Sequence, residues 1–518
     1  MKVVILADHD ESEAHMTPAG TARAAKRLAK LLRGVDTRAP AAHGDLEISA
    51  LAYDSRLVKP GSLFVAIRGE KTDGNRFVPE AVTNGAVAIL SEQTNPGGAV
   101  PAEFPWIQVA DARRALAISA ANYYGRPADI LKIVGVTGTN GKTTTSYLVD
   151  SILRAAGCEV GLLGTIGYRL VRESRPAPNT TPESLDLQRY MAEIVGAGGT
   201  HVVLEASSHA LAMDRLWGCP LAVAIFTNLT RDHLDYHKTI DEYFAAKRRL
   251  FEGTGAAAPA TGVINRDDEY GRQLTGLATR TLTYGLESGA DVTTRKPAIS
   301  LSGIEFMAET PAGRFDVRST LVGRPNVYNI LAAIGAGVAL ALPIEVIARG
   351  IAQLSAVPGR FERVEVGQPF LVVVDYAHTD DALRNLLATA RELNPNGRII
   401  TLFGCGGDRD RTKRPLMGEA AGHASDIIVL TSDNPRSEDP LLIINDVIVG
   451  VQRTKTKLLV EPDRQKAIKV ALDQARSGDT VLLAGKGHET YQVLRDRTIE
   501  LDDREVARRT LSQGGYGD

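Results

Sequence analysis

The chain has 518 residues, a length that predicts about three domains. Apolar residues make up 44% and charged residues 24%, as in ordinary globular proteins, and a net charge of −2 argues against a nucleic acid or a membrane surface as partner. Cys158, Cys219 and Cys405 lie far apart, which argues against disulfides and zinc and suits the reducing cytoplasm. The apolar run at 1–7 is too short for a signal peptide, and no stretch could span a bilayer.

Residues 1–46 form an N-terminal extension without a recognisable role, in which Thr17–Leu32 has the spacing of a helix. A folded unit is expected to begin near Leu46. Strands are predicted at Ile48–Tyr53, Leu63–Ile67, Ala86–Leu90 and Trp106–Val109, with helices at Arg76–Thr83 and Asp111–Tyr124. The polar turns at 54–56 and 69–74 follow strand ends, where ligands often sit, but plain turn chemistry explains them equally well.

Residues 133–156 predict a strand, a phosphate loop and a helix in that order. Gly138 and Gly141 allow the backbone to approach an anion closely, and the start of the helix offers free N–H groups. Lys142 can reach terminal phosphates, and the hydroxyl of Thr143 can hold Mg²⁺. Val136 stands where the common pattern has glycine, so the loop is a variant that reads Gly-Thr-Asn-Gly-Lys-Thr. The alternative is a glycine-rich turn without a nucleotide.

Alternating strands and helices continue through residues 113–356 and predict a parallel sheet that is covered on both faces. Strands are predicted at Lys132–Thr137, Val160–Leu163, His201–Glu205, Ala222–Thr227 and Gly262–Asn265. Strand-like pieces at 282–321 should flank the sheet, and a long helix should follow at Asn326–Ala341.

A Pro-Gly pair within Val357–Arg360 predicts a hinge, after which a second doubly wound unit begins. Its strands are predicted at Leu371–Asp375, Arg398–Phe403, Asp426–Thr431, Lys457–Val460 and Thr480–Ala484. We therefore expect an α/β chain with three domains, at 47–112, 113–356 and 357–518, after the extension at 1–46.

Polar clusters stand at the ends of several predicted strands. Glu205 ends one of them, where a carboxylate can hold the Mg²⁺ of a nucleotide, although a lone capping carboxylate is an alternative. His209 and His233 lack the partner spacing of a zinc site, so each taken singly is best explained as a satisfied polar histidine.

Six of these clusters together resemble the Mur ligases over residues 47–505. They are Thr137-Gly-Thr-Asn-Gly-Lys-Thr-Thr144, Asn179-Thr-Thr-Pro-Glu183, Glu205-Ala-Ser-Ser-His209, Asn228-Leu-Thr-Arg-Asp-His-Leu-Asp-Tyr-His237, Asp375-Tyr-Ala-His378 and Asp433-Asn-Pro-Arg436. Folylpolyglutamate synthetases share the Gly-Thr-Asn-Gly-Lys loop but usually continue it with Gly-Ser. Thr143-Thr144 and the Asn-Pro-Arg sequence favour the Mur branch.

The resemblance implies a central phosphate-loop ATPase domain with a parallel sheet, an N-terminal α/β domain for a uridine nucleotide and a C-terminal Rossmann-like domain. It also implies that ATP phosphorylates a carboxylate and that an amine attacks the acyl phosphate, with Mg²⁺ as cofactor. The implied ATP-binding residues are Gly138, Thr139, Asn140, Gly141, Lys142, Thr143, Thr144 and Arg360. The implied catalytic residues are Lys142, Glu205, His233 and Lys247, and the metal ligands are Thr143, Glu205 and a carbamylated Lys247.

The implied small-molecule substrates besides ATP are UDP-MurNAc-L-Ala-D-Glu and meso-diaminopimelate. Positions matching the nucleotide-sugar site are Tyr53, Ser55, Glu70, Lys71, Thr72, Asn179, Thr180, Thr181, Ser207, Met213 and Arg215. Many relatives have Gln where this chain has Met213. Positions matching the diaminopimelate site are Arg409, Asp433, Asn434, Pro435, Arg436, Gly485 and Glu489.

Arg436 is expected to select the amino acid, because a guanidinium reads the second carboxylate of diaminopimelate and repels the ammonium of lysine. Closure of the C-terminal domain about Val357–Arg360 should bring the reactants together. We expect a cytoplasmic monomer without nucleic-acid or membrane partners. The alternative functions are a folate or poly-γ-glutamate ligase and a regulator that binds ATP without making amides.

Overall fold

The computed structural model describes residues 24–38, 43–69, 72–98 and 100–517, and these residues fold into two compact units. The first unit contains the described residues up to Ile133 together with 159–220 and 253–257. The second unit contains 134–158, 221–252 and the described residues from 258 onward. Glu70 and Lys71, predicted to contact substrate, lie outside the described residues, as does the part of the Thr17–Leu32 prediction before residue 24.

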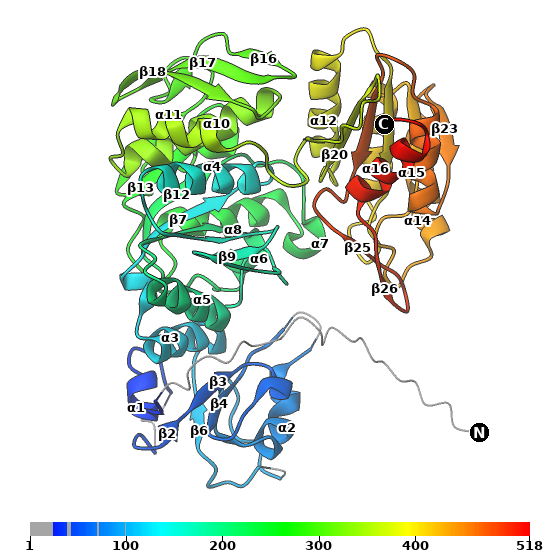
Figure 1. Ribbon diagram of the computed structural model, residues 1–518. Helices are drawn as coiled ribbons and strands as arrows, with labels where there is room; N and C mark the ends of the chain where they lie inside the picture. The colour runs from blue at the N-terminus through cyan, green and yellow to red at the C-terminus, as the bar shows by residue number, and fades with distance from the viewer. Residues whose placement is uncertain (1–23, 39–42, 70–71, 99, 518) are drawn as a thin grey trace, which may run out of the picture. The chain divides into compact units, whose positions relative to one another are not determined.

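The N-terminal part of the first unit is a four-stranded parallel sheet in the order β3-β4-β5-β6 (Figure 1). These strands are Ala50–Ala52, Ser62–Ala66, Ala86–Ser91 and Trp106–Gln108, close to the predicted ranges. The helices are α2 (Val78–Thr83) and α3 (Ala112–Tyr124), and Asp111 caps α3 because its side chain accepts from the N–H groups of Arg113 and Arg114.

The helix predicted up to Leu32 is only partly confirmed in its described part. Residues Lys26–Arg27 form strand β1, which pairs with β2 (Glu47–Ile48), and only Leu28–Leu31 form the short helix α1. Leu28 and Leu31 are buried in the same core as Ile48. The apolar spacing that predicted a long helix is thus satisfied by one helical turn packed on the sheet.

The rest of the first unit contains a run of four strands in the order β10-β9-β8-β11. Strands β8 (Val160–Leu163) and β11 (His201–Glu205) are parallel and occupy the predicted residues, whereas β9 (Tyr168–Leu170) and β10 (Glu173–Arg175) complete an antiparallel edge. Helices α5 (Ser184–Gly196) and α6 (Ser208–Ala212) complete this part, and α5 packs against α3.

The second unit begins within β7 (Lys132–Thr137), which continues through a loop into α4 (Lys142–Ala155). Its strands follow the order β7-β12-β13-β14, and the last three are parallel. They are β12 (Leu221–Phe226), β13 (Thr261–Asn265) and β14 (Arg280–Tyr284), with helices α7 (Leu234–His237), α8 (Ile240–Glu252) and α9 (Glu269–Arg272) between them.

The flank predicted at 282–321 is an antiparallel sheet next to two helices. Its strands are β15 (Thr293–Thr294), β16 (Ala298–Ser300), β17 (Gly303–Thr310) and β18 (Gly313–Ser319). Helices α10 (Arg324–Ala339) and α11 (Ile344–Gln353) both pack against α4, the helix that follows the phosphate loop (Figure 1).

The C-terminal part of the second unit is a six-stranded sheet in the order β19-β20-β24-β21-β22-β23. After β19 (Glu362–Arg363) the parallel strands are β20 (Leu371–Asp375), β21 (Ile399–Phe403), β22 (Ile427–Leu430), β23 (Lys457–Val460) and β24 (Thr480–Ala484). Helices are α12 (Asp380–Leu393), α13 (Lys413–Ala424), α14 (Pro440–Val451), α15 (Arg464–Asp473) and α16 (Asp503–Gln513), and β25 (Tyr491–Val493) pairs with β26 (Thr498–Glu500).

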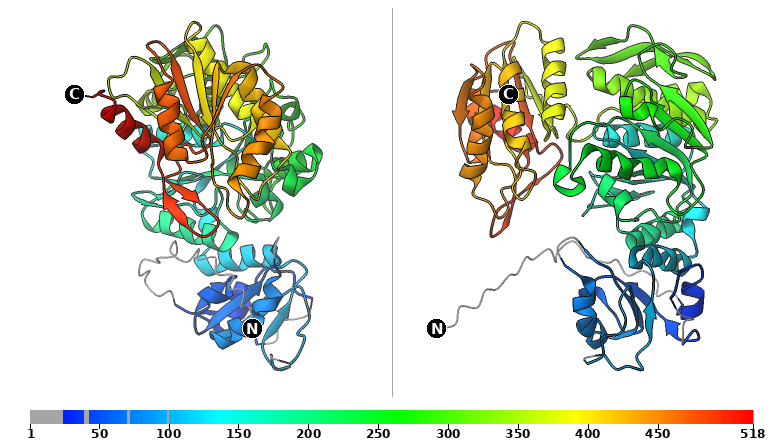
Figure 2. Two further views of the ribbon diagram at one scale, coloured as in Figure 1. Left: turned by 90° about the vertical axis from the view of Figure 1, so that its right-hand side faces the viewer. Right: turned by 180° about the vertical axis from the view of Figure 1, so that it is seen from behind.

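Successive apolar side chains along the strands of this sheet point to opposite faces, so each face has a hydrophobic core. Val373 packs with residues of α12, α13 and α14, whereas Val372 and Val374 pack with residues of α15 and α16. The ribbon views show helices on both faces of this sheet (Figure 2). Because successive side chains of a strand point to opposite faces, a continuous apolar strand requires helices on both sides. The doubly wound sheet predicted for the C-terminal part of the chain is confirmed.

Candidate active site

The phosphate loop requires glycine at two positions for different local reasons. Gly138 has φ +144°, and a Cβ atom there would lie 1.9 Å from Oγ1 of Thr227. Gly141 has φ +85°, and its Cβ atom would lie 2.3 Å from Oδ1 of Asn329. The loop therefore fits tightly between β12 and α10 and admits no side chain at either position.

Asn140 lies at the tip of this loop and is held from three sides. Its N–H group donates to Oδ1 of Asn228 at 2.9 Å, and its carbonyl oxygen accepts from the hydroxyl of Thr227 at 2.6 Å. Its side-chain amide donates to Oδ2 of Asp381 at 2.7 Å. Thr139 is fixed as well, since its hydroxyl accepts from the N–H of Thr230 at 3.0 Å. These bonds preorganise the loop before any nucleotide binds.

The cation and the hydroxyl predicted for this loop lie at the start of α4. Nζ of Lys142 donates to the carbonyl oxygens of Gly138 at 3.0 Å and Thr139 at 2.8 Å, so its charge stays over the loop. The hydroxyl of Thr143 accepts from Nη2 of Arg360 at 3.1 Å. Thr143 and Thr144 are both buried. The guanidinium of Arg360 also lies 4.4 Å from the ring centroid of Tyr376.

Lys247 comes from α8 and ends beside the same loop. Its side chain is 1% exposed, and Nζ donates to the carbonyl oxygen of Gly138 at 2.7 Å. Burial lowers the pKa of Lys247 well below its ordinary value, and the nearby Lys142 lowers it further, against the opposite effect of Asp232. The structure thus buries an amine that tends to be neutral, where the sequence alone would place a solvated lysine.

His233 precedes α7 in a left-handed conformation with φ +54°. Its Nε2 atom lies 3.2 Å from Oδ2 of Asp232. Burial raises the pKa of Asp232, but the nearby His233, His378 and Lys413 outweigh it and lower the pKa to about 2. An ionised carboxylate therefore stands beside the imidazole, and sequence reasoning did not select it.

Glu205 ends β11 in the first unit and is 1% exposed. Its two carboxylate oxygens accept from the N–H and the hydroxyl of Thr165, each at 2.9 Å. The hydroxyl of Thr181 donates to the backbone oxygen of Glu205 at 2.6 Å and accepts from the N–H of Ser207 at 3.1 Å. Thr181, which lies 24 positions before Glu205 in the sequence, is thus brought together with Glu205 and Ser207.

Arg215, which follows the end of α6 by three residues, contacts the same group. Its Nη1 donates to the carbonyl oxygen of Thr181 at 2.9 Å, and its Nε lies 3.2 Å from Oε2 of Glu183. Nη2 of Arg215 lies 3.7 Å from the sulfur of Met213. Met213 therefore contacts this group through its thioether sulfur, a weak acceptor, where a Gln would offer an amide.

The other predicted nucleotide-sugar residues make local contacts in the first unit. The hydroxyl of Tyr53 donates to Oδ2 of Asp186 at 2.7 Å, and that of Ser55 donates to Oε2 of Glu80 at 2.8 Å. The carbonyl of Asn179 accepts from the hydroxyl of Tyr168, and the hydroxyl of Thr180 lies 3.2 Å from that of Thr165. The carbonyl of Thr72 accepts from the N–H of Gly69 at 2.9 Å.

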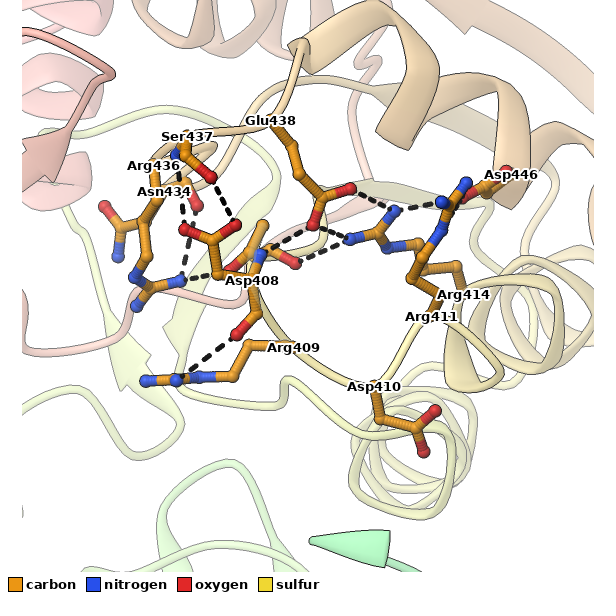
Figure 3. A network of polar contacts seen from close by, with 12 residues as sticks. Asp408, Arg409, Asp410, Arg411, Arg414, Asn434, Arg436, Ser437, Glu438 and Asp446 are labelled. Carbon is orange, nitrogen blue, oxygen red and sulfur yellow. Dashed lines mark hydrogen bonds and ion pairs between the residues drawn. The ribbon is translucent and has the colours of Figure 1, made fainter. Parts of the chain in front are cut away.

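Two guanidinium groups, those of Arg409 and Arg436, gather at the ends of β21 and β22 (Figure 3). A Cβ atom on Gly406 would lie 3.0 Å from Nη1 of Arg436 and 3.8 Å from Cγ of Arg409. Burial and the positive charge of Arg409 lower the pKa of Arg436. The partly buried guanidinium of Arg436 and the exposed guanidinium of Arg409 favour an anion between them, and a carboxylate fits their geometry.

A buried ion pair fixes the two loops that carry these arginines (Figure 3). Arg414, which is fully buried, donates to both carboxylate oxygens of Glu438, at 2.7 and 3.0 Å. Glu438 in turn accepts from the N–H of Asp408 at 2.6 Å, and Asp408 accepts from the hydroxyl of Ser437 at 2.6 Å. The Arg409 loop and the Arg436 loop are therefore held to each other.

An acidic group lies at the end of β24, in the same part of the chain. Asn434 donates from Nδ2 to Oε2 of Glu489 at 3.0 Å, and Lys486 donates to both residues at 3.2 and 3.0 Å. Oδ1 of Asp433 is buried and makes no hydrogen bond among the described residues. Gly485, with φ +111°, carries its Cα close to Asp433, and Pro435 links Asn434 to Arg436.

Sequence reasoning missed Lys486 and Asp381. Lys486 stands between Gly485 and Gly487 at a strand end, and this placement could have indicated a buried position. Asp381 follows the Asp375–His378 cluster by three residues, and its contact with Asn140 depends on tertiary structure alone.

A phosphate loop on a parallel sheet, with separate basic and acidic clusters, defines a nucleotide-dependent α/β enzyme. Sequence profiles described as "Mur ligase family, catalytic domain", "Mur ligase middle domain" and "Mur ligase, glutamate ligase domain" match residues 47–124, 136–337 and 359–487. The chain belongs to the Mur ligase family.

Two curated relatives share the name UDP-N-acetylmuramoyl-L-alanyl-D-glutamate–2,6-diaminopimelate ligase. The protein of Solibacter usitatus is 57% identical over 91% of this chain and 94% of its own length, and that of Geobacillus thermodenitrificans is 46% identical over 91% and 96%. A solved structure of a ligase with the same name has a TM-score of 0.66 and 34% identity, and covers 95% of this chain and 100% of its own.

In the described part of the chain, no helix is long and apolar enough to cross a membrane.

Proposed function

We propose that the chain is an ATP-dependent ligase that adds meso-2,6-diaminopimelate to UDP-N-acetylmuramoyl-L-alanyl-D-glutamate during the synthesis of peptidoglycan precursors. The relatives that carry this activity in their names support it over nearly the whole chain. The observation that carries the choice of amino acid is the pair of guanidinium groups, Arg409 and Arg436, beside the acidic group of Asp433 and Glu489. The end of diaminopimelate that does not react carries a carboxylate and an ammonium on one carbon atom, which match these two charges, whereas the same end of lysine carries only an ammonium.

The proposed reaction has two steps. An oxygen of the D-glutamyl carboxylate attacks the γ-phosphorus of ATP, and ADP leaves. The neutral amine of diaminopimelate then attacks the acyl carbon, phosphate leaves, and the amine loses a proton to give the amide. Two anions meet in the first step, so positive charge must stand over the transferred phosphate. Lys142, held over the loop by Gly138 and Thr139, supplies such a charge.

Mg²⁺ suits the donors that the chain offers. Thr143 has a hydroxyl, Glu205 a buried carboxylate, and a carbamate on Lys247 would add two more oxygens, all hard ligands of the kind that Mg²⁺ prefers. When bound, Mg²⁺ would neutralise charge on the phosphates. The proposed role of His233 is to stand near the metal site, with Asp232 fixing its imidazole.

Carbamylation of Lys247 follows from its burial. Only a neutral amine attacks CO₂, and burial favours the neutral form of Lys247. The nitrogen of the neutral amine bonds to the carbon of CO₂ and a proton is released, which gives an anionic carbamate whose oxygens can bind a metal. We therefore propose that Lys247 acts as its carbamate.

The nucleotide-sugar substrate is proposed to bind the predicted residues of the first unit. Thr181, Ser207 and Arg215 form a connected polar group there, and Arg215 offers positive charge for an acidic substrate. The thioether of Met213 offers the substrate only a weak acceptor at this position.

The three-domain division at 47–112, 113–356 and 357–518 is part of the proposal, with closure about Val357–Arg360. Gly359 is tied to the C-terminal part, because its carbonyl accepts from the N–H of Tyr376 at 3.0 Å and a Cβ atom on it would lie 2.0 Å from the N atom of His488. Any pivot should therefore lie on the N-terminal side of Gly359. ATP is a cytoplasmic metabolite, so we place the reaction in the cytoplasm.

Release of phosphate by purified protein tests this function. We expect release only when ATP, Mg²⁺, the UDP-MurNAc-dipeptide and meso-diaminopimelate are all present, with a product heavier by one diaminopimelate minus water. Comparable turnover with L-lysine would overturn the assigned amino acid. Turnover with a folate and glutamate instead would favour the folylpolyglutamate alternative, and ATP binding without phosphate release would favour a regulator.

A further inference from the structure

The side chain of Lys486 has no solvent exposure and lies among residues proposed to hold the amino acid. Nζ lies 3.0 Å from Oε2 of Glu489 and 3.5 Å from Oδ1 of Asp433, so one ammonium contacts two carboxylates. It also donates to Oδ1 of Asn434 at 3.2 Å. A cation at this position needs an explanation, because the proposed ligand brings an ammonium of its own to the same carboxylates.

We propose that Lys486 is a positioning residue that balances the charge of Asp433 and Glu489 and holds Asn434 and Glu489 in place to receive the ammonium of the incoming amino acid. This inference rests on the proposed function, since it takes an amino acid as the ligand. It deepens that function by naming the group that prepares the acidic side of the site.

Lys486 balances the charge of the acidic pair. Asp433 is 7% exposed and Glu489 is largely buried, so these two carboxylates, withdrawn from water, need a counter-ion. Lys486 supplies that counter-ion and leaves a net charge of −1 on the three residues. This charge suits one ammonium.

Lys486 also fixes the orientation of the Asn434 side chain. Oδ1 of Asn434 accepts from Nζ of Lys486 and from the N–H of Val493 at 2.9 Å, so its amide cannot turn over without losing both bonds. The Nδ2 atom then faces Glu489 at 3.0 Å. Oδ1 of Asp433 is buried and makes no hydrogen bond among the described residues, which leaves an acceptor for a ligand.

Other charged or titratable groups also face this acidic pair. They are Arg436, Arg464, Tyr376, Tyr491 and Cys405. The two arginines stay charged throughout the pH range of the test below, and Arg464 is paired with Asp503 at 2.6 Å. Burial raises the pKa of Tyr376 and Tyr491, and raises that of Cys405 to about 12, so these three groups stay neutral.

Calorimetric titration of the full chain with meso-diaminopimelate, in the presence of a non-hydrolysable ATP analogue, tests this role independently of turnover. In Lys486→Met the acidic pair should take up a proton that the ligand must displace. We expect binding at neutral pH about tenfold weaker or more, with partial recovery at mildly alkaline pH and with proton release that the wild type lacks. If Lys486→Met does not fold, Lys486→Gln, which keeps a hydrogen-bond donor but removes the charge, should show the same two effects.

Arg398→Met is the matched control, because Arg398 forms an ion pair with Asp479 at the opposite ends of the strands in the same sheet. It should lower stability without changing the affinity or its pH dependence. Unchanged affinity in both Lys486 variants would overturn the inference. A loss of affinity in Arg398→Met as large as that in the Lys486 variants would also overturn it, because the loss would then follow from lower stability alone. Binding that depends on Lys486 in a protein without turnover would refute the proposed function and leave the inference standing.

Discussion

Nζ of Lys247 donates a hydrogen bond to the carbonyl oxygen of Gly138 at 2.7 Å, which places a buried amine against the turn of the phosphate loop. The two residues are 109 positions apart in the sequence. The contact joins the nucleotide-binding part of the fold to the residue proposed to carry a carbamate. It also explains why burial and the neighbouring Lys142 lower the pKa of this amine.

Lys247→Ala should lose most of the ligase activity, because it removes the proposed metal-binding carbamate. Short-chain carboxylates such as acetate should restore part of it by filling the space with an oxygen donor. The measurement is kcat with and without added acetate. Arg248→Ala on the same helix is the control, since Arg248 is half-exposed and pairs with Glu252, and it should keep full activity. A fully active Lys247→Ala variant would refute the carbamate.

Gly138→Ala should abolish nucleotide binding, because the new Cβ atom would lie 1.9 Å from Oγ1 of Thr227 at a φ angle of +144°. The affinity for an ATP analogue, measured by calorimetry, should fall more than tenfold, in line with strain of about 1–3 kcal/mol together with the displaced loop. Gly157→Ala also sits at positive φ but meets no atom within 4 Å, so it should lose some stability and keep its affinity. Equal effects of the two changes would argue against a tight loop.

Arg436→Ala should weaken discrimination between diaminopimelate and lysine. Loss of a desolvated guanidinium that pairs with a carboxylate costs about 2–5 kcal/mol, so kcat/KM for diaminopimelate should fall more than tenfold while that for L-lysine stays unchanged or rises. Arg411→Ala is the matched control, because Arg411 lies nearby but is exposed and pairs with Asp446 (Figure 3). An equal loss for both amino acids would show that Arg436 does not read the second carboxylate.

His378 should make the free energy of unfolding depend on pH. Burial, and then the charge of Lys413, lower its pKa from 6.5 to about 4, so the unfolded chain binds more protons between these values. Stability should therefore fall as the pH drops from about 6.5 to 4, by about 3 kcal/mol from this group. His378→Gln should flatten this part of the curve, whereas His423→Gln, at an exposed residue, should not. A curve unchanged by His378→Gln would contradict the assignment.

Much of the fold could be predicted because the buried strands carry continuous apolar runs. Leu371–Asp375 was predicted residue for residue as β20, and the phosphate loop was found between β7 and α4 from its two glycines, lysine and hydroxyl. These signals are local, so the sequence displays them directly. The helix predicted up to Leu32 was only partly confirmed because Lys26–Arg27 pairs with β2, a contact between distant segments.

The connections within the candidate site were beyond sequence reasoning. Lysines are usually solvated, and although the glycines beside Lys486 could indicate a buried position, nothing in the local pattern predicts that it lies among Asp433, Asn434 and Glu489. The pairing of Asp381 with Asn140 likewise depends on how the chain folds back on itself. Motifs identify which residues act together, and tertiary structure decides which charges balance them.

The most direct test of the account follows oxygen through the reaction. With the D-glutamyl carboxylate of the substrate labelled with ¹⁸O, mass spectrometry of the released phosphate and of the tripeptide product reports whether the carboxylate is phosphorylated before the amine attacks. The account predicts one labelled oxygen in the phosphate and a new amide to diaminopimelate. Unlabelled phosphate, or no amide when all substrates and CO₂ are present, would contradict it.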